Sequence, residues 1–228
     1  MALLVRSWNL FHGNTLPPTR HSHLRAMIEL AVSERPDVVC LQEIPVWAVP
    51  KLAQWSGLGA FPAIARQGLR PAAFAGWLTR LDNGLLRSAI AGQANAILVA
   101  PAHDAADLGH VQISDRGRER RVCQAARVGS MVVANLHASI DPAAAAEEVE
   151  SARVFAESLA APDETVVLAG DFNLVEHRLV GYSPPGPGID HVLVRGTGSA
   201  SVAVWPVARR VQNGHVLSDH APVELVVG

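Results

Sequence analysis

Short apolar runs that end in polar residues, glycine or proline recur along the chain, and their length is typical of β-strands. Such runs are residues 3–8, 37–41, 60–66, 73–79, 95–100, 108–113, 121–128, 130–139, 165–173, 189–196, 201–207 and 221–227. Gly129 separates two of these runs, 121–128 and 130–139, which predicts a hairpin. Residues 80–93 show no clear period and are expected to be irregular.

Helices are expected in three places. Residues 21–34 space their apolar side chains at helical intervals, with Ser22 as the expected N-cap. A second helix is expected over about 46–55. The clearest helix begins at Asp141-Pro142, because Asp141 can cap the first turn and Pro142 suits that turn.

This mixture of helices and strands, with neighbouring strands often in hairpin order, favours an α+β arrangement over an all-parallel doubly wound sheet. We therefore expect helix layers against two mixed sheets. The chain has 228 residues, with no obvious internal repeat and no interdomain linker. Residues 1–228 are expected to form a single domain.

Composition narrows the class of protein. Hydrophobic residues make up 49% of the chain and charged residues 18%, which indicates a compact globular protein and excludes a disordered one. The net charge of −2 does not by itself indicate nucleic-acid binding, but it is compatible with a local basic patch. Cys40 and Cys123 lie in apolar runs, which predicts buried free thiols in a reducing compartment. With no secretory signal and no membrane-spanning run, the sequence predicts a cytoplasmic protein without a membrane partner.

One apolar run, residues 166–169, ends abruptly in Gly170-Asp171-Phe172-Asn173. Gly, Asp and Asn are common in turns, so a simple turn is one interpretation. The other is a polar site at the carboxyl end of a buried strand. A period of two would point Asp171 and Asn173 to the same side if the extended geometry continued. The rest of the chain has to decide between the two.

Polar side chains also stand at the ends of other apolar runs. Besides Asp171 and Asn173, they are Asn9, Glu43, Asn135, His137, Asp190, Asp219 and His220. If they converge, several carboxylates lie close together and need a compensating cation. Hard oxygen ligands with few imidazoles and no thiolates suit Mg²⁺ or Mn²⁺ rather than Zn²⁺.

Seven motifs follow one another along the chain: SWNL, LQE, GQANAILVA, NLHAS, GDFNLV, IDHVLV and SDHAPVEL. In these motifs and their order the chain resembles the endonuclease/exonuclease/phosphatase superfamily. Each motif falls at a predicted strand end. The resemblance implies a four-layered α/β sandwich, with two mixed β-sheets packed face to face, helices outside, and the site at one end. It also implies a hydrolase of phosphate ester bonds, of the nuclease or phosphodiesterase type, with Mg²⁺ as its cofactor or Mn²⁺ as an alternative.

By this resemblance, Glu43 of LQE is the principal metal ligand. Asn9 of SWNL lies beside it, and Asp219 of SDH contributes to the same metal region. The ion can act as a Lewis acid on the phosphoryl oxygen and stabilise the leaving group. Asp171 of GDFN would orient or deprotonate the attacking water, and Asn173 would hold the nucleophile or the phosphate.

The resemblance also assigns the histidines. Asp190 of IDH would hydrogen-bond His220 and fix its tautomer. His220 would either take the proton of the water or stabilise the transition state as an imidazolium. His137 of NLH is typical of the branches that resemble deoxyribonuclease, 5-phosphatases and sphingomyelinases, where it contacts the phosphate or helps the leaving group. The AP-endonuclease branch has a tyrosine pattern instead, and the single tyrosine here, Tyr182, lies after GDFN, so that branch is not expected.

Asn95 and Asn135 are weaker candidates for substrate contacts. Asn95 falls where many family members have Gly-Asn-Ala-Ile-Leu, although it could equally be the entry to a core strand. Most of the remaining histidines are expected at the surface. Among them His12 stands out, because it follows closely behind Asn9.

The substrate is left open by the sequence. The cluster DRGRERR at 115–121, with Arg66 and Arg70, either binds a phosphate backbone or is a solvated hairpin loop. The family favours a DNA or RNA nuclease that uses metal-assisted in-line attack of water. The alternatives are a phosphatase or phosphodiesterase of a small phosphorylated molecule or lipid head group, and a catalytically silent binding module. No protein partner is predicted.

Overall fold

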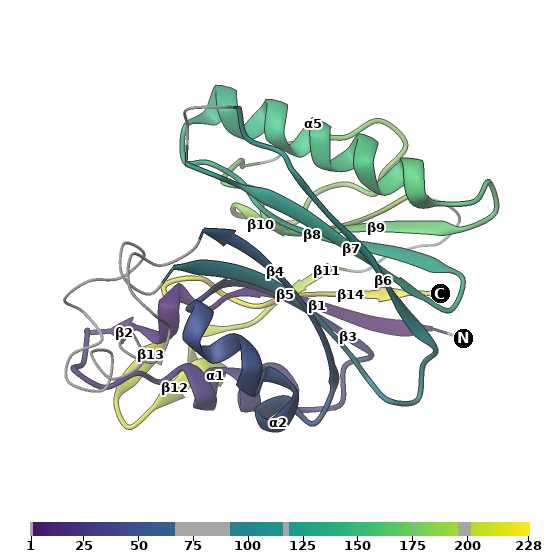
Figure 1. Ribbon diagram of the computed structural model, residues 1–228. Coiled ribbons are helices and arrows are strands. Elements are labelled where there is room, and N and C mark those ends of the chain that lie inside the picture. The colour runs from purple at the N-terminus through teal and green to yellow at the C-terminus, as the bar shows by residue number, and fades with distance from the viewer. Residues whose placement is uncertain (1, 67–91, 116–118, 176, 196–201) are drawn as a thin grey trace.

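A computed structural model describes residues 2–66, 92–115, 119–175, 177–195 and 202–228. In these residues two mixed β-sheets pack face to face, with helices on the outer side of each sheet (Figure 1). The four-layered α/β sandwich expected from the sequence is confirmed. The expected strand at 73–79, the residue Arg70 and most of the stretch 80–93 lie outside the described residues.

The first sheet has the strand order β11-β14-β1-β3-β5-β4. Its strands are β1 (Leu3–Asn9), β3 (Val38–Ile44), β4 (Gly59–Arg66), β5 (Gln93–Val99), β11 (Val202–Val204) and β14 (Val223–Val227). β1 and β3 run parallel, with Asn9 opposite Gln42, whereas β14 is antiparallel to β1. The two parallel strands finish at the end of the sandwich opposite the chain termini (Figure 1).

The second sheet has the strand order β10-β9-β8-β7-β6. Its strands are β6 (Ala105–Gln112), β7 (Val122–Val128), β8 (Met131–His137), β9 (Thr165–Asp171) and β10 (Asp190–Arg195). β7 and β8 form the predicted hairpin around Gly129. β8 and β9 run parallel and place His137 opposite Asp171. Antiparallel β10 then places Asp190 opposite the same Asp171.

A small third sheet joins the loop after β1 to the segment before β14. It consists of β12 (Val211–Gln212), β13 (His215–Leu217) and β2 (Thr15–Leu16), and the short 3-10 helices η1 (Phe11–Gly13) and η3 (Val207–Arg210) lie close to it in the chain. The backbone N–H of Ser218 also donates to the carbonyl of Asn14 at 3.1 Å. This sheet was not expected, because strands of two or three residues are too short to show a period.

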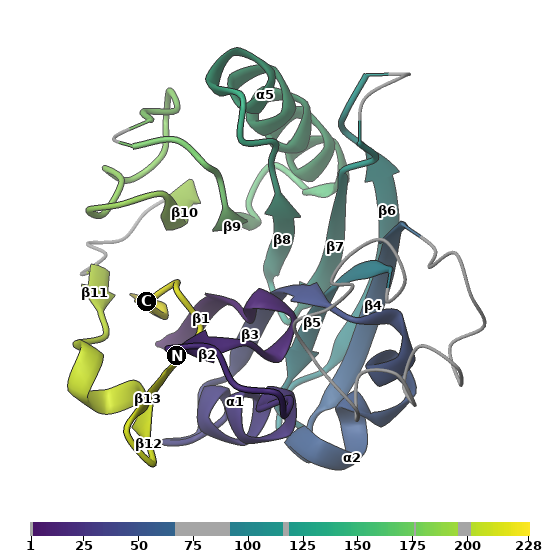
Figure 2. The same cartoon turned by 90° about the vertical axis from the view of Figure 1, so that its left-hand side faces the viewer.

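Helix α5 (Pro142–Leu159) covers the second sheet, as Figures 1 and 2 both show. The Asp141 carboxylate accepts a hydrogen bond from the Ala144 backbone N–H at 2.9 Å, so the expected N-cap is confirmed. Within the described part of the chain, no helix is both long and apolar enough to cross a membrane.

Helices α1 (Leu24–Ala31) and α2 (Leu52–Ser56) cover the first sheet (Figure 1). Ser22 is not the N-cap of α1, because the carbonyl of His23 accepts the first helical hydrogen bond, from Met27. Only the end of the expected helix at 46–55 is α-helical. A 3-10 helix, η2 (Val46–Lys51), precedes α2 and contains a proline, which has no backbone N–H to donate.

Apolar side chains from both sheets fill the space between them. β8 is buried along its whole length, which explains its continuous apolar run. Cys40 belongs to this inter-sheet core and Cys123 to the core beneath α5, and both are free buried thiols as expected. Burial raises the pKa of both thiols above the usual range.

Gly170 marks a close approach between β8 and β9. It lies opposite Leu136 in the parallel ladder and has φ of +144°. A Cβ atom at this position would overlap the carbonyl group of Leu136. The glycine that begins the GDFN motif is therefore required by packing at the last step before the site.

Replacing this glycine tests the close approach. We expect Gly170→Ala to lower the free energy of unfolding by roughly 3 kcal/mol or more, through backbone overlap and an unfavourable φ. Gly181→Ala is the matched control, since Gly181 also has a positive φ, of +82°, but open space around it. The control should cost only about 1–2 kcal/mol, the penalty of a left-handed backbone for alanine. Urea denaturation measures both losses, and equal losses would contradict the overlap.

Candidate active site

Polar residues from both sheets lie together at the end of the sandwich opposite the termini. Each is at, or next to, the end of a strand, and each was expected from the sequence. They are Asn9 in β1, Glu43 in β3, His137 in β8, Asp171 in β9, Asp190 in β10, and Asp219 and His220 just before β14. The parallel pairs end together and the sheets face one another, so strand topology assembles the cluster.

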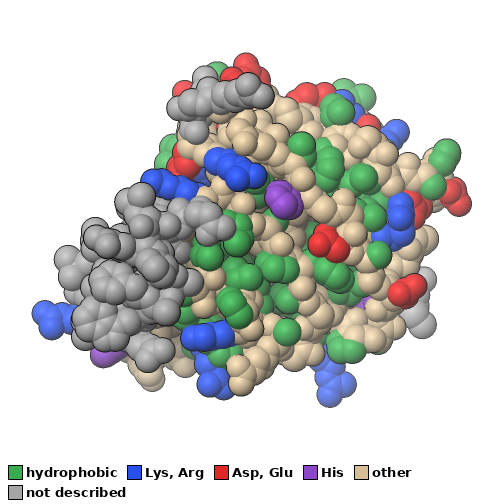
Figure 3. Space-filling model, in the orientation of Figure 1, with side chains coloured by type: hydrophobic (Ala, Val, Ile, Leu, Met, Phe, Trp, Pro, Cys, Tyr) green, Lys and Arg blue, Asp and Glu red, His purple; other side chains and the backbone are tan. Residues whose placement is uncertain are grey.

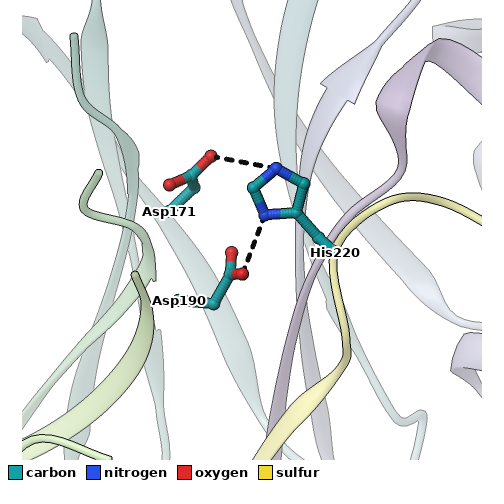
Figure 4. Close-up of side chains that lie close together, drawn as sticks. All are labelled: Asp171, Asp190 and His220. Atoms are coloured by element: carbon teal, nitrogen blue, oxygen red, sulfur yellow. Dashed lines mark hydrogen bonds and ion pairs between the residues drawn. The ribbon is translucent and has the colours of Figure 1, made fainter. Parts of the chain in front are cut away.

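His220 lies between two carboxylates (Figure 4). Its Nδ1 is 2.8 Å from Oδ2 of Asp190, and its Nε2 is 3.8 Å from Oδ2 of Asp171. Asp190 and Asp171 are paired across β10 and β9, so the register of the sheet presents both to one imidazole. The carbonyl of His220 accepts a hydrogen bond from the indole N–H of Trp8 at 3.0 Å. The imidazole is therefore anchored with Nε2 directed at Asp171.

These carboxylates determine the charge of His220. Burial by itself disfavours the imidazolium. The hydrogen bond to Asp190 and the charges of Asp190, Asp171 and Asp219 outweigh that penalty and raise the pKa of His220 to about 9. In the metal-free protein at neutral pH, His220 is therefore a cation.

Asp171 is the most deeply buried carboxylate of the cluster, with 1% of the residue exposed. Burial, followed by the neighbouring charge of Asp190, raises its pKa to about 7, against the lowering effect of His220. Its Oδ2 accepts a hydrogen bond from the Asn9 amide at 2.9 Å, and its Oδ1 accepts one from the Asn173 backbone N–H at 3.0 Å. Asp171 is thus held rigidly at the seam between the sheets.

Asn173 does not continue the strand. β9 ends at Asp171, and Asn173 has φ of +50°, in the left-handed region. The extended geometry that would point Asp171 and Asn173 to the same side does not continue, because the chain turns at once. The Asn173 side chain instead donates to the carbonyl of Ala138 at 2.9 Å. The turn and the polar site proposed as alternatives are the same structure.

His137 is held by two residues that were not singled out as site residues. The Gln93 side-chain nitrogen is 2.7 Å from Nδ1 of His137, and Arg121 lies 3.1 and 3.2 Å from its two ring nitrogens. Burial, then the nearby charge of Arg121, lowers the pKa of His137 well below its usual value. In the sequence, Arg121 stands out only as part of the basic cluster 115–121, and Gln93 only as part of the GQANAILVA motif.

Glu43 lies next to two histidines. Its Oε1 is 3.8 Å from Nε2 of His137, and its Oε2 is 3.5 Å from Nε2 of His12. The same Nε2 of His137 is 3.5 Å from Asp171, so this imidazole connects Glu43 to the Asp171–Asp190–His220 cluster. Asp219 is more exposed, and its Oδ1 is 3.8 Å from Nε2 of His220.

The donor set fits a divalent cation. Asp171, Asp190 and His220 offer ligand atoms within 4.8 Å of one another, a spacing that could hold a metal ion. Glu43 and Asp219 add two further carboxylates at the same end of the sandwich. Burial, and then the negative charge of Asp190, raises the pKa of Asp171, and a bound cation would lower it.

Two asparagines that were expected beside the metal or the substrate make contacts within the protein. Asn9 contacts Asp171 through its amide nitrogen, and its oxygen accepts from the Phe11 N–H at 2.9 Å, which supports positioning of Asp171 over direct metal ligation. Asn135 is fully buried between the sheets. It bonds to the carbonyl groups of Leu41 and Ala96 and to the Gln42 amide, as an inter-sheet link rather than a substrate contact.

Asn95 is equally remote from the surface. It is 1% exposed, and its amide nitrogen donates to the carbonyl of Val122 at 3.2 Å. This contact joins β5 of the first sheet to β7 of the second. Of the two interpretations raised by the sequence, the structure supports entry to a core strand.

The sequence matches a model of the Endonuclease/Exonuclease/phosphatase family over residues 7–220. The chain belongs to this family. Membership supports phosphoesterase activity. No curated protein matches the chain.

Solved structures share the fold of this family member over nearly its whole length. A conserved protein of unknown function from Enterococcus faecalis has 15% identity and a TM-score of 0.70, covering 99% of this chain and 100% of that one. Truncated TDP2 from Caenorhabditis elegans has 14% identity and a TM-score of 0.67, covering 99% and 97%. A mannosyl-6-phosphatase from Bacteroides thetaiotaomicron has 15% identity and a TM-score of 0.64, covering 99% and 100%. At these identities the likeness shows the fold.

The raised pKa of His220 predicts how stability depends on pH. A histidine whose folded pKa exceeds its unfolded value stabilises the folded state below the unfolded pKa of about 6.5, and this contribution is lost as the pH rises through about 9. In EDTA, the free energy of unfolding should therefore fall across this window by up to about 3 kcal/mol. Urea unfolding at several pH values measures it. His220→Gln should show a smaller fall, which then comes from Asp171, whose raised pKa of about 7 also makes stability decrease as the pH rises. An unchanged profile in the variant would contradict the assignment.

Proposed function

We propose that the protein is a divalent-metal-dependent phosphodiesterase that cleaves DNA or RNA by in-line attack of water. The observation that carries the proposal is the arrangement of His220 between Asp190 and Asp171 at the end of the sandwich (Figure 4). In such an arrangement, the buried carboxylate can accept a proton, and the imidazole held by the other carboxylate can stabilise the negative charge that develops on the substrate.

Each residue of this arrangement has a distinct part in the proposed reaction. Asp171, held by Asn9 and by the Asn173 N–H, orients the attacking water and takes its proton. Asp190 holds the ring of His220, so that Nε2 donates a hydrogen bond to the phosphoryl oxygen as its charge grows. His137 contributes a further hydrogen bond to the phosphate.

Glu43 and Asp219 would hold the divalent ion, Mg²⁺ or Mn²⁺, at the edge of this arrangement. When bound, such an ion acts as a Lewis acid on a phosphoryl oxygen. Asn9 then serves the reaction indirectly, because its amide keeps Asp171 turned toward the water.

A small phosphorylated molecule is a second candidate substrate. The mannosyl-6-phosphatase neighbour favours it, and so does the scattered basic charge on the one face drawn in Figure 3. On the face shown in Figure 3, the described Lys and Arg side chains stand apart among apolar and acidic ones. Glu119 pairs with Arg121 at 3.2 Å and with Arg66 at 3.8 Å, which partly neutralises the cluster next to His137.

Activity assays test the proposed reaction directly. Plasmid DNA, single-stranded DNA, RNA, sugar phosphates, inositol phosphates and a chromogenic phosphodiester are assayed with Mg²⁺, Mn²⁺ or EDTA. We expect EDTA to abolish hydrolysis, and Asp171→Asn and His220→Ala each to reduce kcat by about 100-fold or more. Hydrolysis that survives both substitutions would refute the site, and full activity in EDTA would refute the metal.

The dependence on salt then separates the two substrate classes. A nucleic-acid substrate releases condensed counterions on binding, so KM should rise steeply with salt concentration. Turnover of a small phosphate ester should change little over the same range. Steep salt dependence with DNA or RNA supports the nuclease, and a preference for a sugar phosphate supports the phosphatase.

The role of Glu43 has a separate test in binding. A divalent ion that binds only the folded protein raises the melting temperature. We expect Mg²⁺ or Mn²⁺ to raise it in the parent protein and much less in Glu43→Ala. Glu29→Ala, which removes an exposed carboxylate on α1, is the control. An equal shift in Glu43→Ala would exclude Glu43 as the principal ligand.

A further inference from the structure

His12 lies beside Glu43 in a way that a hydrogen bond alone does not explain. Its Nε2 is 3.5 Å from Oε2 of Glu43, beyond the usual N–H···O range of about 2.7–3.2 Å. On the other side of the carboxylate, Nε2 of His137 stands 3.8 Å from Oε1. The carboxylate therefore has an imidazole near each oxygen, and neither is close enough for a strong hydrogen bond.

Both sides of the Glu43–His12 contact depend on a left-handed backbone. Glu43 has φ of +54°, and Phe11 and His12 have φ of +47° and +52°. Non-glycine residues rarely adopt this conformation, and where it persists it often marks a functional site. All three lie at this one end of the sandwich, next to the proposed metal region.

The turn that carries His12 is fastened to the strand that carries Glu43. The Leu10 N–H donates to the carbonyl of Gln42, the residue before Glu43, at 3.1 Å. At the other side of the turn, the Asn14 side chain donates to the carbonyl of Phe11 at 2.7 Å. The imidazole of His12 is largely buried, at 8% side-chain exposure. The position of His12 relative to Glu43 is therefore built into the fold.

The distance between His12 and Glu43 matches the spacing of two ligands of one metal ion. Two adjacent ligands, each about 2.1 Å from a cation, lie roughly 3 Å apart. The 3.5 Å gap between His12 and Glu43 is close to that separation. We propose that His12 is a ligand of the divalent ion held by Glu43, and that its imidazole makes the site prefer Mn²⁺ to Mg²⁺. This inference rests on the proposed metal-dependent function.

The preference follows from the ligand types. Mg²⁺ selects oxygen ligands in a strict octahedron and keeps much of its water. A nitrogen ligand raises the affinity of a site for first-row transition-metal ions. Among these ions, Mn²⁺ also binds well to carboxylates and water. One imidazole among carboxylates therefore adds more affinity for Mn²⁺ than for Mg²⁺.

Electron paramagnetic resonance of bound Mn²⁺ provides a readout that is independent of activity. Titration of the 228-residue protein with Mn²⁺ gives its affinity, Mg²⁺ competition gives selectivity, and pulsed measurements report nitrogen bound to the ion. In His12→Ala we expect the nitrogen coupling to weaken, Mn²⁺ affinity to fall by on the order of tenfold, and Mg²⁺ affinity to change little. His110→Ala, which removes an exposed histidine on β6, is the control and should match the parent protein.

His12→Gln separates ligation from positioning and guards against misfolding, since it retains a side-chain hydrogen-bond donor. Loss of the Mn²⁺ preference in this variant supports ligation by the imidazole. Retained preference or unchanged nitrogen coupling in either His12 variant would overturn the proposal. If the parent protein binds no Mn²⁺, or Glu43→Ala binds it equally well, the metal site of the proposed function fails as well. If Glu43→Ala abolishes binding while the His12 variants bind normally, only the role of His12 fails.

Discussion

The burial of the Asp171 carboxylate is the constraint on which this end of the molecule depends. Its carboxylate lies between the two sheets, with 1% of the residue exposed to solvent. Burial of a charge is costly unless other groups compensate, and here they come from separate elements: the amide of Asn9, the backbone N–H of Asn173 and the imidazoles of His137 and His220. The two sheets are joined at this end by polar contacts as well as by apolar packing.

A second polar layer lies directly beneath these contacts. Asn135 on β8 bonds to the carbonyl groups of Leu41 and Ala96 in the facing sheet, and Gln42 donates to the Asn135 side chain at 2.8 Å. Buried amides of this kind stabilise one arrangement of the sheets, because any shift would leave them without partners. The register that places Asp171 opposite Asp190 and beside His137 is therefore stabilised by the Asn135 contacts between the sheets as well as by strand pairing within each sheet.

Much of the fold and the identity of the central residues could be predicted from the sequence. Apolar strands with polar residues at their ends imply convergence, because parallel strands end at a common edge, as β8 and β9 do at His137 and Asp171. Asn173 could not be predicted in this way, since the left-handed turn at its position breaks the period of two. Asn135 was misjudged for a different reason. A polar residue on a buried strand has the same local signal whether it faces a substrate or the opposite sheet.

Contacts between distant segments were also beyond local patterns. Gln93 at the start of β5 reaches His137 from the facing sheet, whereas Arg121, just before β7, lies beside His137 within the β7–β8 hairpin. His12 meets Glu43 because a strained turn is fastened to β3. The Gln93 contact depends on the packing of one sheet against the other, and the His12 contact depends on the pairing of β1 with β3, and no period along the chain records either.

The central claim is that the crowded, buried carboxylates around Asp171 are arranged for a cation. The most direct test is a carbon NMR titration of the Asp171 carboxyl group, first in metal-free protein and then at saturating Mg²⁺. The Asp171→Asn variant assigns the resonance. The account predicts a metal-free pKa of about 7 that falls by at least two units when Mg²⁺ binds, roughly 3 kcal/mol of coupling. A carboxyl pKa near its ordinary value in both states would contradict it.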